Sequence, residues 1–270
     1  MDDPWARPPG TAAEHRPGNW GGDPVPGPAV EASTGPLVSP ARRLRPARIA
    51  VVGAAILSLV EGLTSAWALW ETRSVAGDEP GGGDTPLDGL TVSQDAIDRF
   101  NAVSGVDGVV AIIGVLALIV AAVFVIRWEN VVLRNQRGLG VPRPRYAPVA
   151  AGFSWFVPIW SLFGPKRALN DAWRAAAPAS EGRAGGDAWL VRAVPTLFTA
   201  WWATWLVGQI VGNGATRLTD DTLSGQTLLY GGSVVACVST IVAGVLFVAV
   251  MERITARHDA RIAEREAPAT

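Results

Sequence analysis

The sequence predicts an all-α integral membrane protein with four transmembrane helices, one re-entrant or interfacial broken helix and a disordered Pro/Gly-rich N-terminal tail. Three observations predict this class. Of the 270 residues, 49% are hydrophobic and only 17% are charged, a balance shifted away from soluble domains. Four apolar runs are long enough to cross a bilayer. Basic residues flank some of these runs, whereas acidic residues fill the loops between others.

The segment before the first apolar run, residues 1–45, is predicted to be a disordered cytoplasmic tail. Prolines and glycines recur there, as in Pro8-Pro9 and Gly21-Gly22, without a periodic apolar pattern. Such a segment buries too little apolar surface to offset the entropy of ordering it. Because no signal-peptide core follows Met1, we expect the first apolar run to be an uncleaved anchor. We interpret the tail as a spacer, with a proline-motif ligand for a protein partner as the alternative.

The membrane domain is expected to cover residues 46–257. Its predicted transmembrane helices are residues 49–70, 106–126, 193–211 and 228–251. About 20 residues at 1.5 Å per residue span a hydrocarbon core of roughly 30 Å. The loop after the first run is acidic, and its Thr91-Val-Ser-Gln94 has the spacing of a capping box, so we expect a short amphipathic helix before the second run.

The basic residues decide the expected topology. They cluster before the first run, after the second, around residues 166–192 and after the last, where a cytoplasmic C-terminal tail, 258–270, is expected. Basic loops stay in the cytoplasm, so four spans place every basic cluster and both termini on that side. A fifth span in the Phe153 region would move two basic clusters outside. Lys166 is the only lysine, a bias typical of a GC-rich bacterial genome, and we expect a bacterial cytoplasmic membrane.

Small residues recur every fourth position in the last two runs: Thr204, Gly208 and Gly212 in one, and Gly232, Ala236, Thr240 and Gly244 in the other. Membrane helices associate closely through such ladders. We therefore predict that residues 193–211 and 228–251 form a tight antiparallel hairpin, with a glycine-lined pore as the alternative. Ser58, Gly62 and Ser65 mark a similar face of the first run.

Glu61 is a candidate functional residue because it lies within the first apolar run, about 18 Å beyond Ile49 and somewhat past the bilayer midplane. A carboxylate at that depth is costly and normally faces a partner, water or a bundle interior. Proton coupling or ligand contact is one interpretation, and a paired or protonated group that serves only packing is the other. Gln209 and Asn213 are the expected hydrogen-bond partners, whereas Asp107 and Glu129 are expected to be solvated.

An aromatic, proline-broken stretch, residues 149–177, is predicted to enter the bilayer surface without crossing. Pro158 and Pro165 interrupt it, so two short helical pieces are expected. The first presents aromatic residues to the interface, and the second is a basic amphipathic helix. Together with Glu61, the candidate functional residues are Trp155, Pro158, Pro165, Lys166, Arg167, Asn170, Asp171, Trp173 and Arg174. In the second piece, Leu169, Trp173 and Ala176 share the apolar face, and Lys166, Arg167, Asn170 and Arg174 lie on the remainder.

Five short motifs lie in this stretch: Trp155-Phe-Val-Pro-Ile159, Leu162-Phe163, Pro165-Lys166, Ala168-Leu-Asn-Asp171 and Trp173-Arg-Ala175. They resemble the bacterial membrane family known as domain of unknown function 4328, and the resemblance extends from about Arg48 to Arg257. Ser161 stands where the family usually has asparagine. The resemblance implies a multi-span, usually actinobacterial, membrane protein, and it implies no activity, cofactor or catalytic residue.

The residues suited to catalysis or metal binding are few. His15 and His258 have no carboxylate or cysteine at ligand spacing, and Cys237 is the only cysteine, so we expect no metal, cofactor or disulfide. No phosphate-binding loop or nucleophile elbow is present, and we expect neither an enzyme nor a nucleic-acid partner. Two interpretations remain. The protein is either a structural or regulatory component whose basic cytoplasmic face binds anionic lipid or a partner, or a small transporter or channel that uses Glu61 and the broken segment.

Overall fold

The computed structural model describes residues 36–141, 144–178, 181 and 188–267. Most of the tail expected at residues 1–45 therefore lies outside the described residues. The proline motif considered as a ligand for a protein partner lies there as well. The described part of the chain is built from helices, with one isolated β-bridge between Pro86 and Thr222. The prediction of an all-α protein is confirmed.

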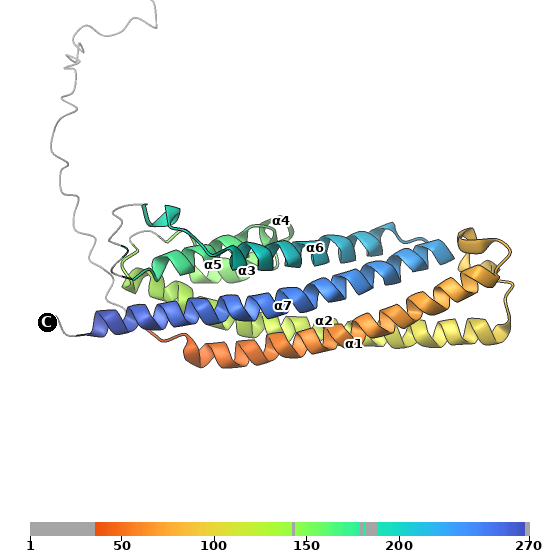
Figure 1. The fold of residues 1–270 in the computed structure, drawn as a ribbon, viewed down its shortest axis with the longest axis horizontal. Coiled ribbons are helices and arrows are strands. Elements are labelled where there is room, and N and C mark those ends of the chain that lie inside the picture. Colours follow the sequence, from red (N-terminus) through yellow and green to blue (C-terminus); the bar gives the residue numbers. More distant parts are fainter. Residues whose placement is uncertain (1–35, 142–143, 179–180, 182–187, 268–270) are drawn as a thin grey trace, which may run out of the picture. The chain divides into compact units, whose positions relative to one another are not determined.

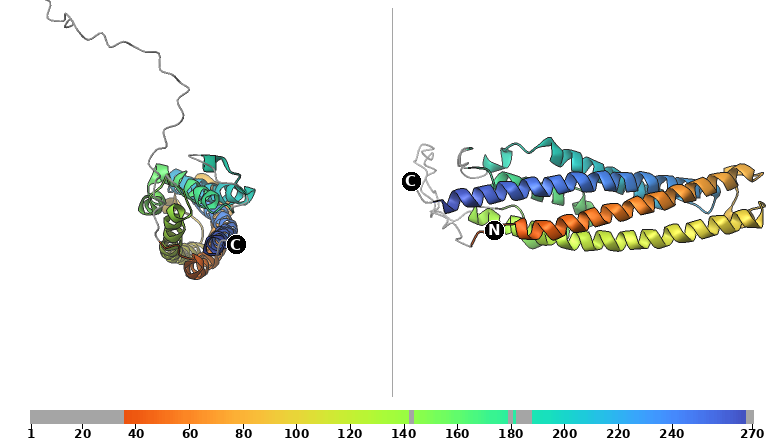
Figure 2. Two further views of the ribbon diagram at one scale, coloured as in Figure 1. Left: turned by 90° about the vertical axis from the view of Figure 1, so that its left-hand side faces the viewer. Right: turned by 60° about the horizontal axis from the view of Figure 1, so that its bottom comes forward.

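Four long helices lie side by side (Figure 1): α1 (Ala41–Asp78), α2 (Gln94–Gly138), α6 (Thr196–Leu218) and α7 (Leu223–Glu266). Helix α1 packs against both α2 and α7, and α6 packs against α7. Helices α2 and α6 make little contact with each other. The two further views in Figure 2 show the same arrangement, with short helices beside α6 at one end of the long helices.

Three helices among the described residues, α1, α2 and α7, are long and apolar enough to cross a membrane, not the four that we expected. The remaining expected span, residues 193–211, forms most of α6. This helix has 23 residues, but tryptophans, threonines and the amides of Gln209 and Asn213 interrupt its aliphatic residues. Its composition therefore lowers its hydropathy below that of the other three.

The long helices also extend beyond the predicted spans. Helix α1 begins at Ala41, within the expected tail, and α7 continues past Met251 to Glu266. The expected amphipathic helix before the second run is the first part of α2, and Ser93 rather than Thr91 caps it, by accepting a hydrogen bond from the Ala96 N–H. Thr91 instead donates to the Glu79 carboxylate from both its N–H and its hydroxyl, over 2.9 and 2.7 Å.

Helices α6 and α7 form the predicted antiparallel hairpin, and small residues permit their close approach. A Cβ atom on Gly212 would lie 3.2 Å from the Ala236 Cβ, and one on Gly232 would overlap the Ala215 side chain. Gly244, the last member of the α7 ladder, faces Ala55 of α1 instead. The ladder therefore joins α7 to two neighbours, as expected for helix packing through small residues.

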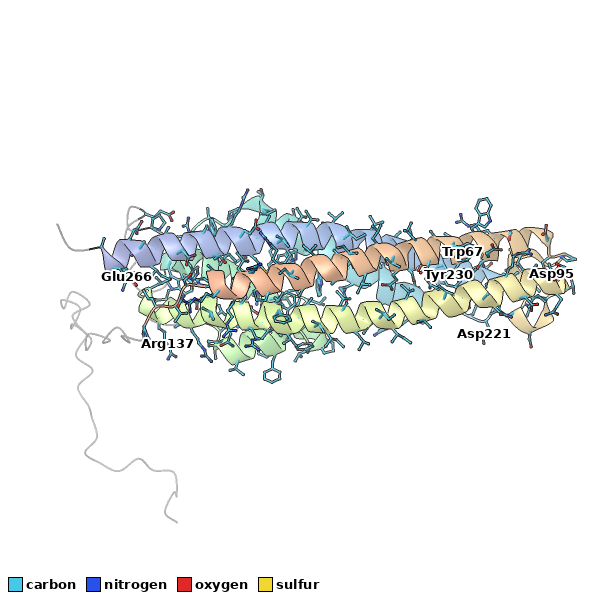
Figure 3. The ribbon with its side chains drawn as sticks, turned by 90° about the horizontal axis from the view of Figure 1, so that it is seen from below. Trp67, Asp95, Arg137, Asp221, Tyr230 and Glu266 are labelled. Atoms are coloured by element: carbon cyan, nitrogen blue, oxygen red, sulfur yellow. The ribbon has the colours of Figure 1, made fainter. Side chains whose placement is uncertain are left out.

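Basic residues and acidic residues gather at opposite ends of the long helices. Figure 3 shows Arg137 near Glu266, and Asp95 and Asp221 at the other end. At the basic end, defined by residues 41–48, 127–138 and 252–266, Arg265 donates to the Gly138 carbonyl oxygen over 2.9 Å. At the acidic end, defined by loops 79–93 and 219–222, the Leu87 N–H donates to the Asp221 carbonyl oxygen over 3.0 Å.

Candidate functional site

The proline-broken stretch forms three short helices, α3 (Pro148–Ser154), α4 (Pro158–Ser161) and α5 (Gly164–Ala175). We call these helices and the residues that connect them the broken hairpin. A proline stands in the first turn of each, including Pro158 and Pro165, where a missing N–H costs no helical hydrogen bond. Gly164 closes the hairpin, because a Cβ atom there would lie 2.6 Å from the Ser154 Cβ. The predicted break into short pieces is confirmed, with α4 as an additional turn.

The broken hairpin is wedged into the bundle rather than laid flat over it. Helices α3 and α5 pack on α2, and α5 also packs on α6 and α7. The Trp155 ring enters the core, with centroid distances of 6.0 Å to Phe247 and 6.3 Å to Trp201. Phe247 precedes Met251, the expected end of the last span, by four residues, so Trp155 reaches about 6 Å inside that boundary.

The tip of the broken hairpin exposes large apolar side chains, which we call the aromatic ridge: Phe153, Phe156, Ile159, Trp160 and Phe163. Each is between 47% and 77% exposed. In water such a patch would be unfavourable, and exposed apolar patches normally mark contact with a membrane or a partner. The sequence predicts these five residues, together with Trp155, for the membrane interface, but the Trp155 ring packs in the core instead.

Two cations follow the ridge directly at the start of α5. Arg167 is exposed, and its guanidinium lies 5.7 Å from the centroid of the Phe163 ring. Lys166 is partly exposed. Their position at the polar edge of α5 agrees with the predicted basic amphipathic helix, whose Leu169 and Ala176 are buried. Asn170 is also partly exposed, although its Oδ1 atom is buried without a hydrogen bond within the described residues.

Asp171 and Arg174 hold α5 in place rather than facing solvent. Asp171 is buried, with Arg174 Nη1 3.4 Å from Oδ1 and Arg145 Nε 3.6 Å from Oδ2. Burial raises the pKa of Asp171, and the charges of Arg145 and Arg174 oppose that rise. Arg174 also donates to the Arg192 carbonyl oxygen over 2.9 Å. The expectation that Arg174 belongs to the open polar face is wrong, because its guanidinium group contacts Asp171 and the Arg192 carbonyl oxygen within the protein.

Trp173 joins α5 to its neighbours from the apolar side. Its ring lies 5.6 Å from that of Phe198 in α6, and the Arg257 guanidinium of α7 lies 4.3 Å from the Trp173 ring centroid. The indole N–H donates to the Ala193 carbonyl oxygen over 3.2 Å. Trp173 is therefore a packing residue between three helices, as its place on the predicted apolar face indicated.

Glu129 is buried, with 1% of its surface exposed, so the expectation that it is solvated is wrong. The Trp155 indole N–H donates to its Oε2 atom over 2.9 Å, whereas Oε1 has no hydrogen-bond partner in the described part of the chain. Val125 and Val132, which precede and follow Glu129 by four and three residues, are also buried. Glu129 thus lies on the buried stripe of α2, and this helical spacing could have identified it.

A second polar cluster lies further along the long helices, around Glu61. Asp107 is buried there and accepts hydrogen bonds from the Thr64 and Ser65 hydroxyls, over 2.7 and 2.8 Å. The expectation of a solvated Asp107 is therefore wrong, because its position in α2 faces α1. Glu61 itself contacts α2 at Gly114, where a Cβ atom would lie 2.8 Å from Glu61 Oε2.

The partners that we predicted for Glu61 are engaged elsewhere. Asn213 donates to the Gln209 carbonyl oxygen on its own helix, over 2.7 Å. The Gln209 side chain lines a cavity to which Glu61 does not contribute. The structure thus brings the candidate residues of the broken hairpin together, and it places Glu61 in a separate cluster about two turns of α1 beyond Ala54, a cavity residue.

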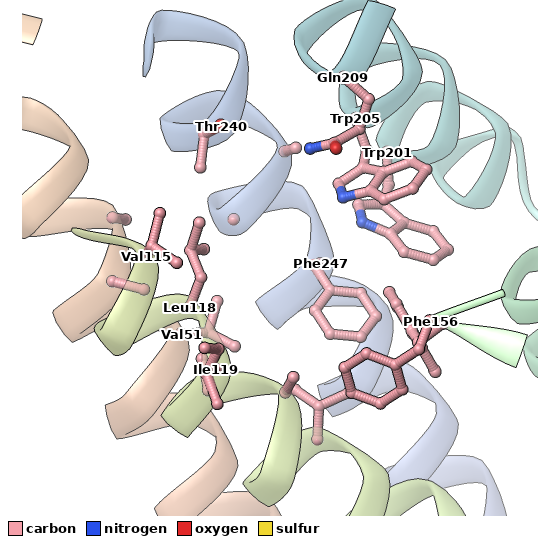
Figure 4. A pocket seen from close by; sticks show the side chains of 18 residues that line it. Val51, Val115, Leu118, Ile119, Phe156, Trp201, Trp205, Gln209, Thr240 and Phe247 are labelled. Atoms are coloured by element: carbon pink, nitrogen blue, oxygen red, sulfur yellow. The ribbon is translucent and has the colours of Figure 1, made fainter. Parts of the chain in front are cut away.

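The cavity has a volume of about 310 Å³ and lies between α1, α2, α6 and α7, with Trp155 and Phe156 of the broken hairpin at its boundary. Its lining is mainly apolar and includes Val51, Leu118 and Phe247. Figure 4 shows Gln209 and Thr240 together near one end of it and Phe156 near the other. No local sequence pattern indicates this space, because four helices and the broken hairpin together form it.

The fold and these sites define a helical bundle with several apolar helices, compatible with a protein embedded in a membrane. Residues 88–256 match the family model described as Domain of unknown function (DUF4328). The match covers more than half of the chain, and the protein therefore belongs to this family. No curated protein and no solved structure matches the chain.

Proposed function

We propose that the protein is a non-enzymatic, structural or regulatory component of a bacterial cytoplasmic membrane that binds anionic lipid through the broken hairpin. The observation that carries this proposal is the aromatic ridge directly followed by Lys166 and Arg167. Aromatic side chains favour the headgroup level of a bilayer. Cations beside them are placed to meet lipid phosphates, each contributing roughly 1 kcal/mol near an anionic surface.

The proposal includes a four-span topology with both termini in the cytoplasm. Helix α2 ends at the basic end, where the broken hairpin follows, whereas α7 begins beside the acidic-end loop through the hydrogen bond from the Leu223 N–H to the Thr85 carbonyl oxygen. If α1, α2 and α7 cross, α6 must carry the chain across to the start of α7. Packing against α7 supports α6 despite its lower hydropathy. The basic end then faces the cytoplasm.

The ion pairs of Asp171 support the lipid-binding role by fixing the orientation of α5. Arg145 and Arg174 converge on its buried carboxyl group, so the helix cannot rotate without breaking these contacts. Lys166 and Arg167 therefore remain beside the ridge. In this arrangement Arg167 offers a planar donor group to a phosphate, and Lys166 adds a mobile point charge.

The test compares lipid binding by the purified full-length protein in neutral detergent. The titrants are fluorescent phosphatidylglycerol and fluorescent phosphatidylcholine. The double variant Lys166→Gln/Arg167→Gln should lower the affinity for phosphatidylglycerol about 30-fold, which corresponds to two contributions of roughly 1 kcal/mol. The control Arg42→Gln/Arg43→Gln removes the same charge from exposed positions of α1 and should change it less than threefold.

Two outcomes would overturn this proposal. One is equal affinity of the unaltered protein for both lipids, which would remove the role of the anionic headgroup. The other is an equal loss in the two double variants, which would show a general effect of net charge rather than a site at the hairpin. Raising the ionic strength should weaken only the phosphatidylglycerol interaction, because salt screens exposed charges.

A second candidate function is a small transporter or channel, which the buried Asp107 beside Glu61 favours. Ionisable groups within apolar helices commonly mark ion or proton pathways. A path that also used the broken hairpin would have to pass the apolar cavity. A single cysteine at Thr240, in a Cys237→Ala background, should react with a charged thiol reagent if water fills that route. Protection of this cysteine would instead favour the lipid-binding function.

A further inference from the structure

We propose that the cavity bordered by Trp155 and Phe156 of the broken hairpin binds one acyl chain of a membrane phospholipid. The inference rests on the proposed function only for the position of the headgroup, since Lys166 and Arg167 would hold it. The acyl-chain site itself is inferred from the geometry of the cavity. Three properties of that cavity carry the inference: its origin, its lining and its continuity with the aromatic ridge.

The cavity exists because the broken hairpin keeps α2 and α6 apart. Helices α3 and α5 pack on α2, and α5 also packs on α6. Gly152 of α3 touches Ile126 near the end of the apolar part of α2, where a Cβ atom would lie 2.9 Å from the Ile126 side chain. Beyond the hairpin tip, α2 and α6 remain separated with little contact between them. The broken hairpin thus holds this space open.

The lining matches a hydrocarbon chain rather than a polar solute. Helix α1 contributes Val51, Ala54 and Ala55, and α2 contributes residues between Val115 and Val125. These positions belong to the predicted spans, so the cavity lies at the depth of lipid tails. No charged side chain is among its described lining residues. A volume of about 310 Å³ is at the small end of ligand sites, which suits a single chain.

The cavity is continuous with the aromatic ridge through Phe156. This residue lines the cavity, yet 60% of its surface is exposed. On the α2 side, Ile119 likewise lines the cavity and is 51% exposed. The occupant can therefore enter from the surrounding bilayer past these two side chains. In this proposal, a lipid whose headgroup lies near Lys166 and Arg167 inserts one acyl chain past Phe156 into the cavity.

Photocrosslinking of the full-length protein in liposomes tests the inference. The probes are phosphatidylglycerol and phosphatidylcholine that carry a diazirine midway along one chain, and crosslinked peptides are identified by mass spectrometry. Saturable labelling is expected on residues 115–125 and 201–209. The variant Ala122→Phe fills the cavity from α2 and should lower this labelling at least fivefold. Its control, Val123→Phe, alters the adjacent exposed position and should leave the labelling unchanged.

A second cavity variant, Ala55→Leu, acts from α1 and keeps the test informative if Ala122→Phe does not fold. Labelling that is unsaturable, or that is equal in Ala122→Phe, Ala55→Leu and Val123→Phe, would overturn the proposal of an acyl-chain site. Loss of the phosphatidylglycerol preference with intact cavity labelling would instead overturn only the headgroup proposal. Labelling of a cysteine at Ala122 by a charged thiol reagent, in a Cys237→Ala background, would show a water-filled cavity and also overturn the inference.

Discussion

The Nε2 atom of His258, in α7, lies 3.0 Å from the carbonyl oxygen of Ala172, in α5. His258 is fully buried, and its Nδ1 atom has no hydrogen-bond partner within the described residues. It lies seven residues beyond Met251, outside the predicted span. A neutral ring with its proton on Nε2 can donate to Ala172, so this contact joins the last helix to the broken hairpin.

This contact predicts that the protein loses stability in mild acid. Burial lowers the pKa of His258 from 6.5 to about 4, the hydrogen bond to Ala172 opposes this change, and the Arg257 charge adds to it. Between these values the unfolded chain binds more protons than the folded protein, so stability falls as the pH drops through this range. The change corresponds to about 3 kcal/mol.

Thermal unfolding of the solubilised protein between pH 7.5 and pH 4 measures this effect. The melting temperature should fall as the pH decreases, and the fall should be smaller in His258→Gln, which cannot titrate. His15→Gln removes the other of the two histidines in the chain; it is the matched control and should behave like the unaltered protein. Identical pH dependence in all three proteins would show that His258 does not contribute.

The sequence predicted the helical class, the segregation of charge and the proline breaks, because each of these depends on local composition. It also predicted the α6 and α7 pairing, since small residues at four-residue spacing define a packing face. The burial of Glu129 and Asp107 was missed because it depends on which neighbour covers a helix face. Thr91 was misassigned as a cap because a competing partner, Glu79, is distant in the sequence.

Among the described residues, three helices rather than four are apolar enough to cross a membrane, for a different reason. Length and flanking charges predict a span at residues 193–211, whereas their tryptophans and amides reduce the hydropathy of α6. The cavity could not be predicted at all. It depends on how far the broken hairpin separates α2 from α6, and no local pattern in the sequence encodes that separation.

Two adjacent glycines in α7 should respond in opposite directions to the same substitution. A Cβ atom on Gly232 would overlap Ala215 of α6, whereas nothing lies within 4 Å of one on Gly231. We expect Gly232→Ala to destabilise the protein by about 1–3 kcal/mol, because α6 and α7 must separate. Gly231→Ala should be neutral or stabilise by up to about 1 kcal/mol. Thermal unfolding in detergent measures both, and equal effects would contradict the close approach.

The proposed topology predicts which side of the membrane each loop faces. In a Cys237→Ala background, single cysteines at Asp95 and Asp221 should react with an impermeant thiol reagent on intact cells. Cysteines at Ser39 and Ala260 should react only after the cells are permeabilised. All four positions are exposed, so protection cannot result from burial in the protein. Reaction of the Ala260→Cys variant on intact cells would exclude a cytoplasmic basic end.

The buried carboxyl group of Asp171 should stabilise the broken hairpin through its two arginines. We expect Asp171→Ala to destabilise the protein by about 1–3 kcal/mol, because it leaves Arg174 partly buried without its carboxylate. Arg145 is more exposed, with 43% of its side chain accessible against 20% for Arg174. Arg145→Gln should therefore cost less than Arg174→Gln in the same unfolding experiment. The reverse order would show that the pairs do not act as described.

The hydrogen bond from Trp155 to Glu129 should stabilise the folded protein in addition to the packing of the Trp155 ring. Trp155→Phe keeps an aromatic ring in the core but removes the only donor that the described structure offers to the Glu129 carboxyl group. An unsatisfied buried group costs about 1–3 kcal/mol, so we expect a loss of stability of that size. Trp160→Phe, at an exposed position of the ridge, is the matched control and should have little effect.

A double-mutant cycle separates this hydrogen bond from the loss of ring volume. In a Glu129→Leu background no carboxyl group remains to be satisfied, so Trp155→Phe should cost only the packing difference between the two rings. The interaction term between the two substitutions is then the contribution of the hydrogen bond. Chemical unfolding in detergent gives the four free energies of unfolding. An interaction term near zero would mean that water, rather than Trp155, satisfies Glu129, and it would remove the polar link between α2 and the broken hairpin.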